Sequence, residues 1–341
     1  MEEELVETFK ESALTWISRP SRAKASADKP PELMLAGQRK DLPDYLELEP
    51  LPYCLDPCGN DLEYYHVESK HVSDHDWQVW HKNLRAIGGS SIAELLGHGY
   101  SGPNTTLDYY LGRKERPEPN NFSRQAMAHG QHYEPYALDI CFMMMPGFFG
   151  TEPEAFKPQK TKVFVVTSKR VKGALLLGST PDYVSNAKRR LIEIKCPYYG
   201  SQDAESAVAF RDSWLAKNPN GKTAYFLQAA YYAWLNKKLI STFYVAVLFV
   251  KNNEEAVLRL WTYQWTIDIG EFFSKWTRKL MSTKAGKLRV TDMQRKEATT
   301  LMCACYMGYK DSDVYSITFD GILQKQCEDE TWDDSDCVPR Q

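Results

Sequence analysis

The sequence predicts an α/β fold in which a mixed β-sheet is flanked by helices. Apolar residues recur at every second position in short segments between residues 163 and 195, which is typical of β-strands. Segments with helical periodicity lie on both sides of these strands, and two further strands follow near residue 250. This order of elements favours a layered α/β core.

The first 75 residues are predicted to be an acidic, proline-rich N-terminal arm. Residues 1–19 carry apolar positions among acids, the pattern of an amphipathic helix that needs a surface to pack on. Residues 19–59 contain seven prolines and no sustained periodicity, as in a linker. We expect the main domain to occupy 76–290 and a C-terminal extension with an acidic tail to occupy 291–341.

Within the main domain the predicted elements follow in a definite order. Helical spacing of Trp77, Trp80, Leu84 and Ile87 indicates a first helix that starts near Asp74. The other predicted helices are 91–96, a short one after the Gly/Pro/Asn turn 97–105, 123–145 and 223–235. The predicted strands are 163–167, 174–179, 183–184, 191–195, 242–250 and 256–265, and the last two form a hairpin across Lys-Asn-Asn-Glu-Glu.

Charge is distributed unevenly along the chain. The formal net charge is −3, but residues 1–76 hold eight Lys and Arg against seventeen Asp and Glu, a net charge of −9. Residues 327–341 carry a net charge of −5, which leaves +11 for residues 77–326. A basic body with acidic ends fits a polyanionic partner, although clusters such as Lys188-Arg189-Arg190 are also common on solvated helix surfaces.

Composition argues against a membrane or secreted protein. The longest apolar run, 243–250, is far shorter than the twenty or so residues that a membrane span needs, and the N-terminus is acidic. The eight cysteines are too sparse for a disulfide scaffold, so we expect an intracellular, reducing compartment, cytoplasm or nucleus, in a host cell if the protein is viral. Cys54/Cys58 and Cys303/Cys305 leave a zinc site as a weak alternative.

Three acids and a lysine form the candidate site. Side chains alternate along a strand, so Glu193 and Lys195 project from one face while Ile192 and Ile194 project from the other. Asp182 lies upstream across a predicted turn, and a hairpin would bring its carboxylate next to Glu193. Two close carboxylates repel unless a cation neutralises them, and hard oxygen ligands select Mg²⁺ or Mn²⁺.

Each of these motifs taken singly has an ordinary structural explanation. A Glu and a Lys two apart on a strand usually form a weak ion pair on one face, and Pro-Asp is usually a turn. Glu134 is less ordinary, because its neighbours along the predicted helix are small or apolar. In combination, in this order and spacing, the motifs favour a metal site suited to phosphodiester hydrolysis.

In these motifs the chain resembles the PD-(D/E)xK nucleases, specifically the lambda-exonuclease or YqaJ-type viral recombinase branch, with a restriction-endonuclease-like core. The resemblance covers roughly residues 77–265 in five blocks. They are Trp80-His-Lys-Asn-Leu-Arg85 with Gly88-Gly89-Ser90-Ser91, Gly130-Gln-His-Tyr-Glu134-Pro135, Gly178-Ser-Thr-Pro-Asp182, Leu191-Ile-Glu-Ile-Lys-Cys-Pro197 and Tyr225-Phe-Leu-Gln228.

The resemblance implies a role for each matching residue. Asp182, Glu193 and the backbone carbonyl of Ile194 would bind Mg²⁺ or Mn²⁺, and Glu134 would bind a second ion or its water. Lys195 would activate the attacking water, and Gln228 would support Lys195 or contact the scissile strand. The remaining expected DNA and phosphate contacts are Arg85, Ser90, Ser91 and Tyr225. The hydroxyl pair lies one residue closer to Arg85 than in the lambda-type pattern, which leaves the direction of digestion open.

The function expected from the resemblance is a metal-dependent exonuclease acting on linear duplex DNA in recombination or viral replication. Expected partners are DNA ends and a single-strand annealing or recombination protein, and the resemblance also allows a homo-oligomer. Two alternatives stay open: an RNA-degrading or structure-specific endonuclease with the same site, and a catalytically silent nucleic-acid-binding adaptor. Sugar preference would separate the first alternative from the exonuclease.

Several other residues invite functional readings that the sequence does not favour. His66, His71, His75 and His81 lie close together but with irregular spacing, so we interpret them as surface histidines. Cys196 alternates onto the Ile194 face and is interpreted as a packed residue. The aromatic residues of 223–235 are expected to be mostly core, apart from Tyr225, which lies one turn before Gln228.

Overall fold

The computed structural model describes residues 46–51, 53–57, 62–69, 86–99, 101–110, 113–115, 117–145, 157–158, 161–168, 174–185, 189–198, 203–237, 239–283, 287–318 and 323–325. The described helices are α3 (Gly89–Leu95), α4 (Pro103–Tyr110), α5 (Asn121–Met144), α7 (Ala207–Lys217), α8 (Pro219–Leu235), α9 (Ile267–Met281) and α10 (Asp292–Cys305). The strands are β1 (Leu46–Pro50), β2 (Leu62–Ser69), β3 (Lys157–Pro158), β4 (Lys162–Ser168), β5 (Ala174–Ser179), β6 (Tyr183–Ser185), β7 (Arg190–Lys195), β8 (Thr242–Lys251), β9 (Glu255–Gln264), β10 (Tyr306–Asp311), β11 (Tyr315–Ile317) and β12 (Leu323–Lys325).

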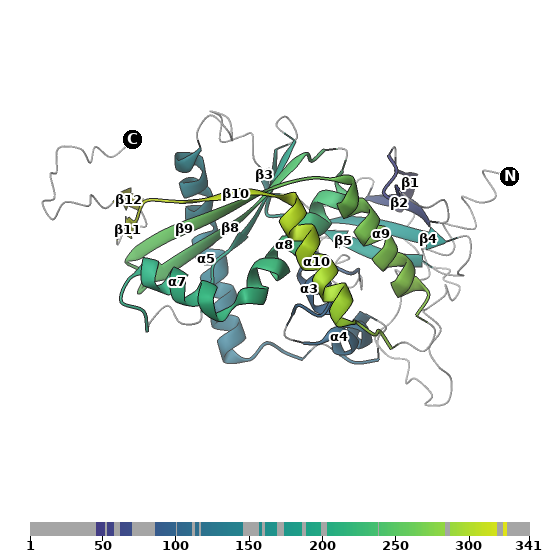
Figure 1. Cartoon of the computed structure of the whole chain (residues 1–341), viewed down its shortest axis with the longest axis horizontal. Helices are drawn as coiled ribbons and strands as arrows, with labels where there is room; N and C mark the ends of the chain where they lie inside the picture. Colours follow the sequence, from purple (N-terminus) through teal and green to yellow (C-terminus); the bar gives the residue numbers. More distant parts are fainter. Residues whose placement is uncertain are drawn as a thin grey trace, which may run out of the picture.

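The strands form two sheets. The smaller has the order β1-β2-β4-β5, and the larger has the order β12-β11-β9-β8-β7-β6-β3 with β10 paired to β9. Within the larger sheet β7 and β8 run parallel, whereas the other pairs are antiparallel. A parallel bridge between Ile87 and Leu177 joins the start of α3 to β5. The predicted mixed sheet with flanking helices is therefore confirmed (Figure 1).

The larger sheet separates two apolar cores. One face carries Leu191, Val245 and Trp261 and is covered by α7, α8 and α9. The other carries Ile192 and Ile194 and is covered by α5, which crosses behind β8 and β9 in Figure 1. The central strands are buried on both sides, which explains why β8 is a nearly continuous apolar run. We call the two sides the α8 face and the α5 face.

Part of the predicted N-terminal arm is folded. Residues 46–50 and 62–69 form strands that extend the β4–β5 sheet, in place of the expected linker and of a compact body starting near Asp74. The linker was predicted from the high proline content. Pro50, however, lies at the end of β1, where the missing backbone N–H has little effect on strand stability. The predicted helix within 1–19 and nearly all of the one starting near Asp74 lie outside the described residues.

A short segment between these strands, residues 53–57, is attached to α8 and α9. The Leu55 carbonyl accepts hydrogen bonds from Trp234 Nε1 at 2.9 Å and from Ser274 Oγ at 2.8 Å. Tyr53 Oη donates to the Leu235 carbonyl at 2.8 Å. Asp56 is buried and forms an ion pair with Arg278 of α9. We call this segment the 53–57 loop.

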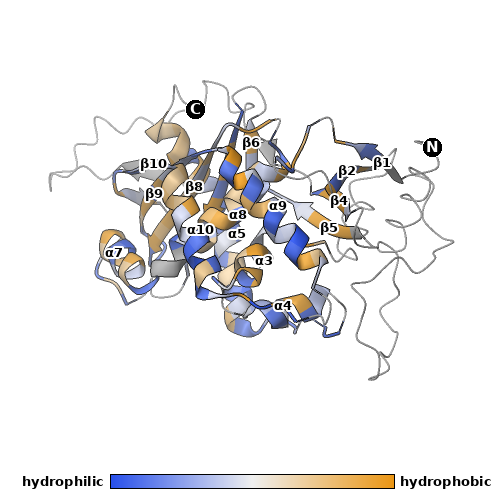
Figure 2. Cartoon of the chain, turned by 45° about the vertical axis from the view of Figure 1, so that its right-hand side comes forward, coloured by the Kyte–Doolittle hydropathy of each residue, from blue (hydrophilic) through white to orange (hydrophobic). Residues whose placement is uncertain are grey.

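The C-terminal part also packs on the main sheet. α9 is amphipathic, with hydrophilic and hydrophobic bands visible in Figure 2, and it buries Phe273 and Leu280. α10 begins with a capping box at Thr291 and Gln294 and packs on α8, and β10 pairs with β9. Residues 292–311, placed by the sequence in an extension, therefore contribute to the same core. The domain boundaries themselves stay a prediction.

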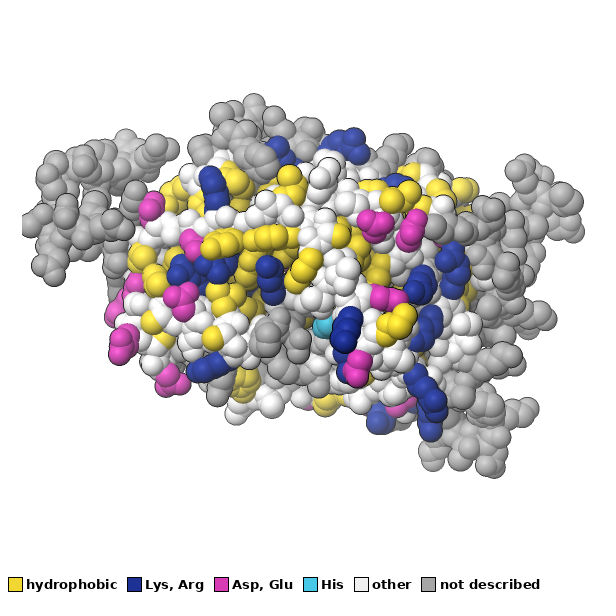
Figure 3. All heavy atoms as spheres, viewed as in Figure 1, with side chains coloured by type: hydrophobic (Ala, Val, Ile, Leu, Met, Phe, Trp, Pro, Cys, Tyr) yellow, Lys and Arg dark blue, Asp and Glu magenta, His cyan; other side chains and the backbone are white. Residues whose placement is uncertain are grey.

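The surface shows no single-sign charge field on the face of Figure 3. Lys and Arg side chains over α9, α10 and the α7–β10 edge have Asp and Glu between them. Ion pairs on these elements include Lys275 with Glu297 and Arg295 with Asp292. Among the described helices, none is both long and apolar enough to cross a membrane.

Candidate active site

The β6–β7 hairpin positions Asp182 beside β7. Tyr183 pairs with Ile192 in an antiparallel ladder, so the residue before β6 lies next to the C-terminal half of β7. Asp182 Oδ2 accepts a hydrogen bond from the backbone N–H of Ile194 at 2.6 Å. The predicted return of the chain is confirmed. It brings Asp182 to the backbone between Glu193 and Lys195.

Glu193 and Lys195 project from the α8 face, as their alternation with Ile192 and Ile194 predicts. The Lys195 ammonium donates to Glu193 Oε1, and it also donates to the Ile194 carbonyl oxygen at 3.1 Å. The Glu193 side chain is only 1% exposed, whereas that of Lys195 is 24% exposed. Lys195 therefore lies between a buried carboxylate and solvent.

Helix α8 supplies the other contacts to this pair. Gln228 Nε2 donates to the same oxygen, Glu193 Oε1. One turn later on α8, Tyr232 is hydrogen-bonded to Gln228. Burial raises the pKa of the Tyr232 phenol, and the hydrogen bond from Gln228 opposes this effect in part. The Tyr232 ring also lies against the start of α3, where a Cβ on Gly89 would be 2.5 Å from a ring atom. Gly89 is thus required for α3 to approach α8 so closely.

Tyr232 is a member of the site that the sequence reasoning missed. It was expected to be core, and its ring is indeed buried. Its four-residue separation from Gln228 places both side chains on one side of α8, which was the available signal.

Glu134 reaches the site from α5, on the opposite face of the sheet. It is half-buried, and burial raises its pKa, with Asp182 raising it further and Lys195 lowering it. The Glu134 carboxyl is therefore electrostatically coupled to Asp182 and Lys195. Hydrogen bonds join Asp182, Glu193, Lys195 and Gln228 to one another or to the backbone between them, and the role of Glu134 stays a prediction.

The cluster contains more acidic than basic groups. Burial raises the pKa of Glu193 to about 8, with a further contribution from Asp182. Burial also raises the pKa of Asp182, against the opposing effect of Lys195. Burial lowers the pKa of Lys195, but the charges of Glu193 and Asp182 more than reverse this, so the ammonium stays protonated at neutral pH. One cation faces three carboxyl groups.

The donor set fits a hard divalent cation. Glu193 Oε2 is buried and has no hydrogen-bond partner, which is costly for a carboxylate oxygen unless a cation binds it. Asp182 and the Ile194 carbonyl provide further oxygens beside it. Within the described residues, no three His, Cys, Asp or Glu side chains stand together as a preformed metal-binding group.

The residues expected to contact phosphate or DNA differ in their exposure. Arg85 lies outside the described residues, and Ser90 is exposed on α3. Ser91 is instead buried, and its Oγ accepts a hydrogen bond from Tyr110 at 2.7 Å, so it holds α4 against α3. Tyr225 is half-buried and stacks on Trp214, with ring centroids 5.6 Å apart. Ser91 is therefore buried and Tyr225 half-buried, and a contact of either residue with a substrate stays a prediction.

Among the described residues, the histidine and the cysteines considered from the sequence are packed or exposed side chains. His66 is half-buried on β2 against Phe164, and burial lowers its pKa to about 4, which replaces the expected surface position. Cys196 packs with the α5-face core, as expected. Cys303 is exposed and Cys305 is buried, and neither belongs to a metal-binding group within the described residues. His71, His75, His81 and Cys58 lie outside these residues.

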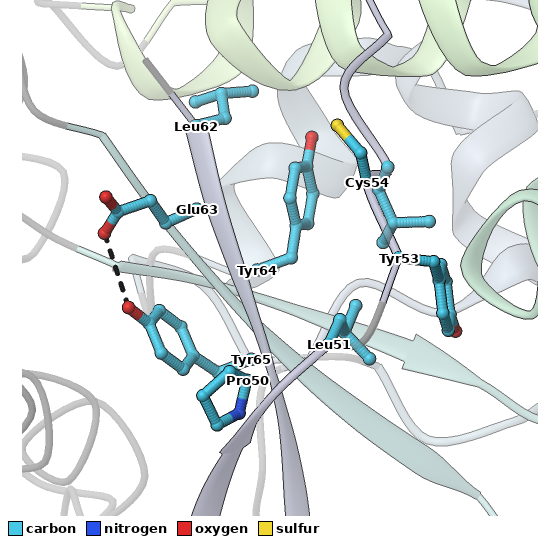
Figure 4. Close-up of a pocket in the computed structure, with 9 residues that line it drawn as sticks. Pro50, Leu51, Tyr53, Cys54, Leu62, Glu63, Tyr64 and Tyr65 are labelled. Atoms are coloured by element: carbon cyan, nitrogen blue, oxygen red, sulfur yellow. Dashed lines mark hydrogen bonds between the residues drawn. The ribbon is translucent and has the colours of Figure 1, made fainter. Parts of the chain in front are cut away.

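A cavity of about 240 Å³ lies away from this cluster, beside β1 and β2. Figure 4 shows Leu51, Tyr53 and Tyr64 around it, and a hydrogen bond from Tyr65 to Glu63 at its edge. None of the clustered site residues lines it.

A comparison with protein-family models matches residues 76–238 to the YqaJ-like viral recombinase domain. No curated protein and no solved structure gives a significant match to the chain. The matched family consists of nucleases that act on DNA in recombination and generally depend on a divalent metal ion. The matched segment contains Glu134, Asp182, Glu193, Lys195 and Gln228. Residues 76–238 thus match the YqaJ-like viral recombinase domain, which belongs to the PD-(D/E)xK lambda-exonuclease-like family.

Proposed function

We propose that this protein is a metal-dependent exonuclease that hydrolyses linear duplex DNA from its ends. The observation that carries the proposal is the cluster of Asp182, Glu193 and Lys195, in which one buried carboxylate oxygen of Glu193 lacks a partner. A structural ion pair would not need a second acid beside one base.

The residues that would hold Mg²⁺ or Mn²⁺ are Asp182, Glu193 through Oε2, the Ile194 carbonyl and Glu134. When bound, a divalent cation lowers the pKa of a coordinated water and offsets negative charge on the phosphate. Gln228 and Lys195 both contact Glu193 Oε1, which fixes the carboxylate and leaves Oε2 for the cation.

Lys195 acts as a donor in this arrangement. Because the neighbouring carboxylates keep its ammonium protonated, it orients the attacking water and stabilises the charge that develops on the phosphoryl oxygens. Its partial exposure allows it to reach a substrate bound outside the sheet. Gln228, held by Tyr232, is a positioning residue for Glu193.

The same proposal covers substrate, process and partner. The substrate is a DNA end, and the process is recombination or viral DNA processing in an intracellular, reducing compartment. The expected partner is a single-strand annealing or recombination protein. Ser90, exposed on α3, and Arg85 are proposed to contact a DNA phosphate. A homo-oligomer would be compatible with this role.

The test is digestion of end-labelled linear duplex DNA, with a closed circle and a single-stranded RNA as parallel substrates, in Mg²⁺ and in EDTA. We expect metal-dependent loss of the linear DNA alone. Lys195→Ala should abolish it, whereas Lys275→Ala, an exposed lysine on α9 that pairs with Glu297, should not. The labelled end that is lost first gives the direction of digestion.

Other outcomes would replace the proposal. Cleavage of the circle or of RNA would indicate an endonuclease or a ribonuclease with the same site. DNA binding without any cleavage would indicate an adaptor that has kept the fold.

A further inference from the structure

The N-terminal half of α5 is an exposed surface with few charges. Phe122 is 49% exposed and Met127 is 57% exposed. Residues 121–133 contain one arginine and no acid, and the nearest acids are Glu118 before the helix and Glu134 at the next position within it. Exposed helices of globular proteins normally carry charges of both signs, so such a composition indicates an interaction surface.

Aromatic rings form a continuous row on this surface. Phe122 and Tyr198 have ring centroids 5.6 Å apart, and Tyr198 and His129 have theirs 5.3 Å apart. The row continues from His129 to Tyr133 at 4.7 Å, and Tyr133 is 5.8 Å from Tyr136. The inner end of the row is buried, whereas the outer three rings are exposed or half-buried. We call Phe122, Tyr198 and His129 the outer rings.

The outer rings are connected to the candidate active site. Tyr198 follows Lys195 by three residues, a chain length that spans at most about 10 Å. Its hydroxyl donates to Gln125 of α5 at 3.3 Å, which orients the ring. His129 is hydrogen-bonded to the backbone of Pro197, and burial lowers the pKa of its imidazole, so the ring is neutral at pH 7. A strand leaving the site would therefore meet these rings.

The chemistry of the surface favours a nucleic acid over a protein. It offers ring faces, amide side chains from Asn121 and Gln125, a single cation at Arg124 and no carboxylate that would repel phosphate. Bases of every kind stack on such rings, and amide groups hydrogen-bond to base edges and phosphates. A basic protein partner would find no acid to pair with in residues 121–133.

We propose that Phe122, Tyr198 and His129 stack unpaired bases of a DNA single strand next to the active site. The proposal deepens the proposed function and rests on it, because it assigns the nuclease a substrate with a frayed or single-stranded end. A fully paired end would have to separate locally before its bases could occupy the outer rings.

The experiment measures binding rather than cleavage, so that it can fail independently of the proposed activity. The full-length protein in EDTA is titrated against two fluorescent DNAs, a blunt duplex and the same duplex with a short oligothymidine tail, by fluorescence anisotropy. Phe122→Ala and Tyr198→Ala are compared with Met143→Ala, which removes a side chain of matched exposure, 48%, near the other end of α5.

The wild-type protein should bind the tailed duplex more tightly than the blunt one. Each of the two ring variants should lose about 5- to 150-fold in affinity for the tailed duplex, the range expected for one stacked base. Affinity for the blunt duplex should stay the same, and Met143→Ala should bind both DNAs as the wild type does. Tyr198→Phe should retain tail binding, because it keeps the ring and removes only the hydroxyl group, which donates to Gln125.

Three results would overturn the proposal. Unchanged tail affinity in both ring variants would show that the rings serve packing alone. An equal loss for blunt and tailed duplexes would indicate a general phosphate surface. A drop in molar mass of the ring variants, measured by light scattering, would indicate that the surface joins two copies of this chain. Circular dichroism melting of each variant checks that the fold is kept.

Discussion

Two ionic clusters lie on the same face of the large sheet and differ in their balance of charge. In the active-site cluster one cation, Lys195, faces three carboxyl groups, and Glu193 Oε2 has no partner. Across the sheet, Lys195 is in register with Val247, Val247 with Arg259, and Arg259 with Asp311. We call the second cluster, formed by Arg211, Arg259, Asp212 and Asp311, the edge cluster.

The edge cluster is complete in itself. Arg259 binds Asp311 through two hydrogen bonds of 2.6 Å, and Arg211 contacts Asp311 at 3.3 Å and Asp212 at 2.9 Å. Two cations balance two carboxylates, and both oxygens of Asp311 are occupied. The comparison shows two roles for charged side chains. A network with equal numbers of acids and bases can stabilise the fold, whereas a buried cluster with an excess of acids lowers stability unless a cation binds.

The largest expected effect is on catalysis. Asp182→Asn keeps an oxygen that can accept from the Ile194 N–H but removes the charge, so cleavage in Mg²⁺ should fall on the order of 10³-fold. Asp311→Asn makes the same chemical change in the edge cluster and should leave the rate unchanged. Initial rates on linear duplex DNA measure both variants. Equal losses would mean that the two clusters do not differ in function.

A buried, balanced pair should matter most for stability. Asp56 in the 53–57 loop has a side chain that is 1% exposed, and its partner Arg278 is 28% exposed. Asp56→Ala breaks this ion pair by removing its buried carboxylate, and should lower the free energy of unfolding by about 3 kcal/mol. Urea denaturation measures the change. Asp292→Ala removes an exposed partner of Arg295 and should shift the midpoint very little.

In the active-site cluster, by contrast, the buried carboxyl of Glu193 should lower folding stability as pH rises. A buried carboxyl whose pKa is raised to about 8 binds its proton more tightly in the folded state, so folding stability falls as pH rises from about 4.5 towards 8. In EDTA, Glu193→Gln should therefore be more stable than the wild type at pH 8.5, by about 1 kcal/mol or more, and the gain should vanish below pH 4.5.

Two controls sharpen this experiment. Glu254→Gln, on the exposed turn between β8 and β9, should show no such gain at pH 8.5. Added Mg²⁺ should raise the melting temperature of the wild type more than that of Glu193→Gln, because the ion binds the folded site. A wild type that stays the more stable at pH 8.5 in EDTA would falsify the assignment of an energetic cost to Glu193.

The smallest effect is expected from the edge cluster. Asp311→Asn should destabilise the protein by about 1 kcal/mol at most, because the Asp311 side chain is 27% exposed and solvent screens the pair. The loss should shrink further at high salt. Urea denaturation at low and at high salt tests this. A loss that does not respond to salt would contradict the view that the edge cluster acts through charge.

Local pattern predicted the sheet and most of the site. The strands β4 to β9 and the helix α5 follow from periodicity, because alternation and helical spacing are properties of neighbouring residues. The same alternation placed Glu193 and Lys195 together, and hairpin geometry brought Asp182 to them. These predictions needed no knowledge of distant contacts.

Local pattern does not show the surroundings of a residue where a distant partner decides them. Ser91 is a buried acceptor because Tyr110 packs against it, and Tyr225 is half-buried with Trp214 stacked on its ring. Neither partner is close in sequence. The strands β1 and β2 were missed because proline content outweighed their pairing with each other, and the pairing of β2 with β4 across about a hundred residues leaves no local signal.

The 53–57 loop shows that the recognisable family segment is not the unit that folds. Trp234 and Leu235 lie inside residues 76–238, but their hydrogen-bond partners in the loop lie outside. A fragment cut to the family boundaries would lose an acceptor for a buried indole and expose the end of the helix that carries Gln228 and Tyr232. Excision or grafting of this module should therefore begin upstream of β1, the first strand among the described residues.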